Sequence, residues 1–187
     1  MTADEYLALS ETDRRQELAG GVLIMSPNPS FKHQRAAMRL GDLFRSQIED
    51  TGRGLVLAVP YDVYVDQYDF VAPDLMVILD ERTKYIENRF REIGPNIAVE
   101  ILSPSTRDRD EKIKPELYRK AGVQEYWIVD AGAPMVTVHG FYDPPYTANC
   151  RKGSAVDSRL VSIKVDDIFA NLVQEPTGNR KWHTKKD

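Results

Sequence analysis

An almost unbroken apolar run, NIAVEIL at residues 96–102, constrains the fold of this chain most strongly. A run of this kind is typical of a strand buried on both faces, so it predicts a central sheet with another layer packed against each side. Glu100 is its one charged residue. A carboxylate in a sheet interior is normally paired, hydrogen-bonded, exposed at an edge or bound to a cation. The run therefore predicts both a layered fold and an acid that needs a partner.

The first half of the chain carries clear signals for local structure. Thr2 and Glu5 have the spacing of a capping box and predict a short helix. Gly20 and Gly21 lie between two extended runs, which is the pattern of a tight hairpin with Glu17 and Leu18 on its first strand. Apolar residues at helical spacing predict the longest helix over residues 30–49.

The remaining elements alternate between strand and helix patterns. Residues 54–79 contain three strand-like runs, which we expect to be neighbours in one sheet. Residues 85–94 read as a weak helix or loop, and the charged run RDRDEK at 107–112 reads most simply as a solvated loop whose arginines could meet phosphates. A helix is predicted from residue 114, followed by strands over 125–130 and 135–142. The order predicts an α/β (α+β) fold with a mixed central sheet flanked by helices.

The composition is that of an ordinary globular protein, with 42% apolar and 29% charged residues among 187. This length suits a single domain, which we expect over residues 1–175. Residues 176–187 are basic and show no periodicity, so we expect them to be disordered. No stretch approaches the roughly 18 apolar residues of a membrane span, and the N-terminus lacks the features of a signal peptide. We therefore expect a cytoplasmic protein with no membrane partner.

Charge and metal-binding residues narrow the function classes. The net charge of -4 and a pI of about 5.5 provide no overall basic field, although a small positive patch could still position a nucleic acid. Cys150 has no intrachain partner, and with three histidines a thiolate and imidazole zinc site is not expected. Any metal ion would then have oxygen ligands.

Two acids in apolar surroundings suggest the chemistry. Asp74 follows Pro73 at the head of the apolar run LMVIL, and Glu100 lies inside NIAVEIL. If their strands are adjacent, both carboxylates can meet at one point and hold a hard cation such as Mg²⁺, together with water and phosphate oxygens. Asp110, Lys114 and Tyr118 follow at a spacing of four, which places them on one face of a helix. A lysine beside metal-bound acids suits phosphodiester hydrolysis.

Several motifs resemble those of a known family. QELAGGVLIMSP, VAPDLMVIL, VEILSPST, the spacing of Asp110, Lys114 and Tyr118, and AGVQEYWIVD occur in the order found in Uma-type restriction endonuclease domains. The resemblance extends from about Glu17 to Ala170. It implies the PD-(D/E)XK nuclease fold and a metal-dependent endonuclease acting on DNA.

The resemblance also implies roles for individual residues. Asp74 and Glu100 become metal ligands, with the Ile101 carbonyl oxygen as a third, and the ion expected is Mg²⁺ with Mn²⁺ as a substitute. Lys114 corresponds to a catalytic lysine displaced from the strand to the next helix. Glu17 matches an early acid that helps hold metal or water. Asp110 and Tyr118 are supporting residues.

The sequence departs from the plain PD-(D/E)XK pattern in one respect, because position 102 is Leu102 where a lysine is usual. The site then depends on Lys114, which Pro115 follows. Proline disfavours the α conformation at the preceding residue, so a helix is predicted to start or kink here, and Lys112 is the nearest substitute for a mis-aimed Lys114.

Structural interpretations stay open for the same residues. Asp74 also suits a turn, Glu100 a core ion pair, and Lys114 a solvated helix surface. We interpret Tyr126 and Trp127 as core packing, and His33 as a residue that could border the site. A second function therefore remains: a non-catalytic protein that keeps the nuclease fold as a homodimeric scaffold or as a nucleic-acid-binding module.

Overall fold

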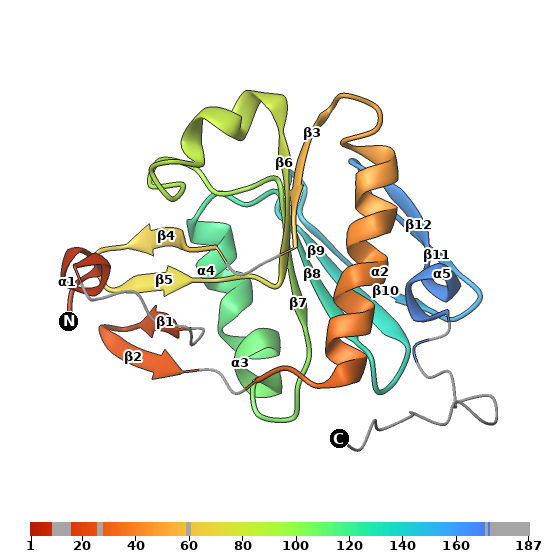
Figure 1. Ribbon diagram of the computed structural model, residues 1–187, viewed down its shortest axis with the longest axis horizontal. Coiled ribbons are helices and arrows are strands. Elements are labelled where there is room, and N and C mark those ends of the chain that lie inside the picture. The colour runs from red at the N-terminus through yellow and green to blue at the C-terminus, as the bar shows by residue number, and fades with distance from the viewer. Residues whose placement is uncertain (9–15, 26–27, 59–60, 171, 173–187) are drawn as a thin grey trace, which may run out of the picture.

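A mixed sheet of six strands forms the centre of the computed structural model (Figure 1). The structure describes residues 1–8, 16–25, 28–58, 61–170 and 172. In spatial order the strands are β10 (Tyr146–Arg151), β9 (Met135–Gly140), β8 (Glu125–Asp130), β7 (Ile97–Ile101), β6 (Leu75–Leu79) and β3 (Gly54–Leu57). The pair β7 and β8 is parallel, whereas the other neighbours are antiparallel. The predicted mixed sheet is thus confirmed.

Both faces of this sheet are covered. Helices α2 (Phe31–Gln47) and α5 (Val165–Phe169) and the hairpin of β11 (Ala155–Asp157) and β12 (Ser162–Lys164) lie on one face. Helices α3 (Arg107–Lys112) and α4 (Lys114–Lys120) lie on the other.

The strand β7 contributes to both cores. Its residue Val99 packs in the apolar cluster that contains Phe44 and Trp127, whereas Ala98 packs in the cluster that contains Leu117 and Tyr118. All five residues of β7 are buried. The prediction of a strand buried on both faces is confirmed.

A second, smaller sheet lies beside α4. Its order is β2 (Val22–Met25), β1 (Gln16–Ala19), β5 (Asp69–Val71) and β4 (Val63–Asp66), all antiparallel, with α1 (Ala3–Leu7) at one end. Val63 and Val71 of this sheet share the apolar cluster of Leu117 in α4. The two sheets and the helices α3 and α4 therefore meet around one interior region.

Local signals in the first half of the chain are confirmed. The side chains and backbones of Thr2 and Glu5 form a reciprocal capping box at the start of α1. Gly20 and Gly21 both have positive φ, at 55° and 77°, as a two-residue hairpin of this type requires. The long helix starts after its N-cap Ser30, as predicted.

Two predictions about elements are wrong. Residues 54–79 hold four strands, and these divide between the two sheets because β5 pairs with β1 whereas β6 pairs with β3 and β7. RDRDEK is a helix, α3, with Asp110 turned inward and buried, because Lys114 lies 3.1 Å from its carboxylate. The predicted weak helix or loop at 85–94 is preceded by a 3₁₀ helix, η1 (Asp80–Tyr85).

Other expectations fall beyond what the structure describes. The tail at 176–187 and residues 26–27 of the QELAGGVLIMSP motif lie outside the described residues. Within those residues, no helix combines the length and the apolar character needed to cross a membrane.

Candidate active site

Asp74 and Glu100 lie together where β6 begins and β7 ends. The Asp74 backbone N–H donates to the Val99 carbonyl at 2.9 Å, and the Ile101 N–H donates to Asp74 Oδ2 at 2.7 Å. The Asp74 carboxylate is therefore held against the backbone on either side of Glu100. Both acids are buried. Ile101 contacts Asp74 through its backbone N–H, and its carbonyl oxygen as a metal ligand remains a prediction.

Lys114 extends from the first turn of α4 into this region and is surrounded by carboxylates. Its Nζ lies 2.7 Å from Glu100 Oε1, 3.0 Å from Glu17 Oε1 and 3.1 Å from Asp110 Oδ1. All four side chains are buried. We call Glu17, Asp74, Glu100 and Asp110, with Lys114, the acidic cluster.

Pro115 determines where α4 begins. It occupies the first turn, where a helix does not need the backbone donor that proline lacks, and the helix starts at Lys114 as predicted. The break between α3 and α4 does not turn Lys114 away from the acids. Lys112, the substitute considered from the sequence, instead pairs with Asp108 at 2.7 Å on the surface.

Two tyrosines add hydrogen bonds. The Tyr118 hydroxyl donates to Glu100 Oε1 at 2.6 Å, and the Tyr126 hydroxyl donates to the Asp110 carbonyl at 2.9 Å. Burial, followed by the charge of Glu100, raises the pKa of Tyr118 well above its usual value. Tyr118 therefore stays protonated and holds Glu100 as a hydrogen-bond donor. Tyr126 is packed as predicted, and it also supports the helix that carries Asp110.

The sequence did not predict the contacts that two basic residues make with the acids of the site. Arg109 Nη1 lies 2.7 Å from Glu17 Oε2, and His33 Nε2 at the start of α2 lies 3.1 Å from Asp74 Oδ2. The sequence predicted only that His33 could border the site, and Arg109 was one of the two arginines in a predicted loop. The one sequence signal for Arg109 is its position next to Asp110. The contact of His33 arises from long-range packing, which local patterns do not encode.

Basic side chains contact the carboxylates of this region. Lys114 and Arg109 contact members of the acidic cluster, and His33 lies beside Asp74. Burying carboxylates is costly unless they are paired, hydrogen-bonded or bound to a cation. Whether this arrangement fits a metal ion therefore depends on its donor atoms.

The donor set fits an open magnesium site rather than a closed cage. In the parts of the chain that the structure describes, no group of three or more His, Cys, Asp or Glu side chains is arranged to hold a metal ion. Mg²⁺ commonly takes only one or two carboxylates and completes its shell with water and substrate phosphate oxygens. Asp74 and Glu100 can supply that minimum.

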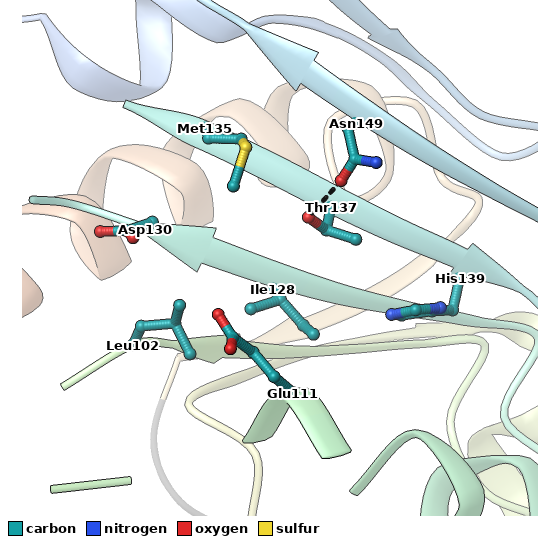
Figure 2. Close-up of a pocket in the computed structure, with 8 residues that line it drawn as sticks. All are labelled: Leu102, Glu111, Ile128, Asp130, Met135, Thr137, His139 and Asn149. Atoms are coloured by element: carbon teal, nitrogen blue, oxygen red, sulfur yellow. Dashed lines mark hydrogen bonds between the residues drawn. The ribbon is translucent and has the colours of Figure 1, made fainter. Parts of the chain in front are cut away.

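A cavity of about 310 Å³ lies on the same side of the sheet, between α3 and strands β8 to β10 (Figure 2). Glu111 of α3 and Asp130 of β8 line it together with Thr137, His139 and Asn149. None of its lining residues belongs to the acidic cluster. The buried acidic cluster and the open cavity are thus separate features of this face of the sheet.

The family follows from the sequence. Residues 3–147 match the family model of Uma2, which is described as a putative restriction endonuclease. The chain belongs to the Uma2 family. No curated protein matches it.

A solved structure supports the fold. The Uma2 chain superimposes on a crystal structure from Anabaena variabilis, described as a putative nuclease belonging to DUF820, with a TM-score of 0.80 and 22% identity. The match covers 92% of this chain and 99% of that chain. At this identity the likeness shows a shared fold, and together with the family it gives the Uma2 chain a nuclease-like character.

Proposed function

We propose that this Uma2 protein is a divalent-metal-dependent nuclease that hydrolyses phosphodiester bonds in DNA. The observation that carries the proposal is the ammonium of Lys114, buried within 2.7 to 3.1 Å of three carboxylates. Buried ionisable groups gathered in this way are more common at functional sites than elsewhere in a fold. The family description supports the same function.

Asp74 and Glu100 would hold Mg²⁺ or Mn²⁺, with the Ile101 carbonyl oxygen as a further ligand. When bound, such an ion polarises a phosphoryl oxygen and lowers the pKa of a coordinated water. Tyr118 and the Ile101 N–H fix the orientation of the two carboxylates through hydrogen bonds. Lys114 provides a fixed positive charge that can orient the attacking water or stabilise the charge that develops on the phosphate.

In this proposal Glu17 and Asp110 hold the side chain of Lys114 in position. Glu17 also accepts a hydrogen bond from the Ala72 N–H at 3.0 Å, so its position is set by the backbone that leads to Asp74. Both acids keep the Lys114 side chain in one geometry. They are positioning residues.

The test is cleavage of supercoiled and single-stranded DNA with Mg²⁺ or Mn²⁺. Asp74→Asn and Lys114→Gln should each reduce the rate by about 100-fold or more, because the first removes a metal ligand and the second removes a positive charge at the reacting phosphate. Lys112→Gln is the matched control and should keep wild-type activity. Loss with Asp74→Asn but not with Lys114→Gln would remove Lys114 from the mechanism. Wild-type protein that cleaves neither DNA with either ion would contradict the proposal.

The burial of the acidic cluster favours a second candidate, a non-catalytic dimeric scaffold or a nucleic-acid-binding module. Lys114 and Glu100 are each only 2% exposed, and their mutual contacts already compensate part of the charge. A scaffold has no need of a divalent ion. Metal binding that is lost with Asp74→Asn separates the two candidates.

A further inference from the structure

Arg109 reaches the acidic cluster from α3, and only part of its guanidinium is paired. Nη1 lies 2.7 Å from Glu17 Oε2, while 15% of the side chain is exposed. The other two nitrogens, Nε and Nη2, are buried and have no hydrogen-bond partner among the residues that the structure describes. The guanidinium is therefore anchored through Nη1. We call the side formed by Nε and Nη2 its unused edge.

The unused edge has a defined geometry. In a guanidinium the Nε–H and the adjacent Nη2–H point the same way in one plane, so they form two parallel donors. The group does not deprotonate in proteins, and it has no acceptor atom. A buried donor without a partner costs free energy, and a charged one costs more. An unsatisfied group of this kind in a folded protein indicates a missing ligand, water or ion.

Neighbouring contacts do not account for this edge. The cation–π pairs of the described residues involve Lys84, Arg91 and Arg159, so no ring of those residues covers Arg109 in that way. Arg107 on the same helix provides a contrast, since its Nη1 and Nη2 are paired with Glu111 at 2.9 Å and Asp130 at 2.6 Å.

We propose that the Nε and Nη2 edge of Arg109 is an oxyanion subsite that binds one phosphate group of a nucleic-acid backbone. Two parallel donors match two non-bridging phosphate oxygens, which is the geometry that favours arginine over lysine for phosphate. The inference rests on the proposed nuclease function, because that function brings a phosphodiester to the acidic cluster.

The contact with Glu17 makes the subsite effective. It fixes the guanidinium beside Glu17, so less side-chain freedom is lost when phosphate binds. Arg109 also brings a positive charge to this carboxylate, which would otherwise repel a phosphate. Both donor nitrogens are shielded from solvent, so an incoming phosphate must displace the atoms that cover them.

Binding of a fluorescent single-stranded oligonucleotide, without divalent ions so that no cleavage occurs, tests the subsite. Arg109→Lys keeps the charge and can still pair with Glu17, but it loses the two-donor edge. It should weaken binding by about tenfold, since one hydrogen bond to a charged group is lost. Arg107→Lys is the matched control in the same helix and should bind like wild type. In Arg109→Gln, the slope of log K against log salt should fall by about 0.7, as expected when one single-strand phosphate contact is removed.

Three results would overturn the subsite: no binding by wild type, unchanged binding by Arg109→Lys, or an equal loss with Arg107→Lys. If the variants fail to fold, the Nε–H resonance of Arg109 in wild-type protein gives a second test, because it should shift when the same oligonucleotide is added and an unmoved resonance contradicts the proposal. Binding that depends on Arg109 without any cleavage with metal would reject the nuclease and keep the subsite. Cleavage at the same rate in wild type and in the Arg109 variants would keep the nuclease and reject the subsite.

Discussion

At the residue scale, Lys114 lies against three of the four carboxylates of the acidic cluster. Its ammonium is within 3.1 Å of Glu17, Glu100 and Asp110, and Arg109 contacts only the first of these. Because the effective dielectric of the interior is low, removing one partner of such a network leaves the others exposed to mutual repulsion.

Lys114→Met should therefore destabilise the fold. We expect the free energy of unfolding at neutral pH to fall by about 3–5 kcal/mol, the usual cost of leaving a buried charge unpaired. Urea denaturation of the variant and of wild type measures this free energy. Lys112→Met, at an exposed surface pair, is the control and should be close to wild type. Equal stability of Lys114→Met and wild type would mean that the acids are neutral or solvated.

Tyr118 gives a prediction for alkaline pH. Burial, and then the charge of Glu100, raises its pKa well above 10.0 in the folded state, so the unfolded state releases its proton first as the pH rises. The stability contributed by the neutral phenol is fully present below about pH 10 and is lost above it.

The unfolding free energy of wild type should then decline as the pH rises from 9 to about 11, and Tyr118→Phe should decline less steeply, because one of the two buried tyrosines no longer titrates. Urea midpoints across this range measure the slopes. Tyr68→Phe, at an exposed tyrosine, should keep the wild-type slope. If the unfolding free energies of Tyr118→Phe and wild type fell equally with pH, the raised pKa of the Tyr118 phenol would be contradicted.

At the element scale, the edge strand β3 requires Gly54. This residue has φ of +155°, and a Cβ there would lie 2.1 Å from the Ile78 carbonyl oxygen of β6. An alanine would force the two strands apart. Gly52, also at positive φ, has no atom within 4 Å of its Cβ position.

Gly54→Ala should cost about 3 kcal/mol through overpacking, whereas Gly52→Ala should cost only the backbone strain of about 1–2 kcal/mol. Thermal unfolding of the two variants compares them directly. A Gly52→Ala variant that loses as much stability as Gly54→Ala would contradict the close approach of β3 and β6.

The elements also show what local patterns can predict. Asp74 and Glu100 stand out because each interrupts or begins an apolar run, and Lys114 follows from the spacing of four that links it to Asp110 and Tyr118. Each of these signals is carried by a few neighbouring residues of the chain. The candidate site could therefore be predicted in outline before its geometry was known.

Long-range pairing explains what the sequence did not reveal. β5 joins the smaller sheet through Leu18 and Phe70, which are far apart in the chain, so the run over 54–79 gave no sign that it divides between two sheets. Helix α3 looked solvated because its residues are charged, although Asp110 is buried. Only the folded chain brings His33 to Asp74.

At the scale of the whole molecule, the two faces of the central sheet differ in kind. The face under α2 and α5 is an apolar core, whereas the face under α3 and α4 combines an apolar cluster with the acidic cluster. The second sheet closes this face and supplies Glu17. The fold thus has an apolar core on one side of the sheet and gathers buried charged side chains on the other.

The central claim is that Asp74 and Glu100 hold a divalent metal ion, and calorimetric titration with Mn²⁺ or Mg²⁺ tests it most directly. Wild-type protein should bind the ion, and Asp74→Asn should bind at least about tenfold more weakly because a ligand is lost. Asp42→Asn, at an exposed acid on α2, is the matched control and should bind like wild type. Absence of binding by wild type, or equal affinity in Asp74→Asn, would contradict the account.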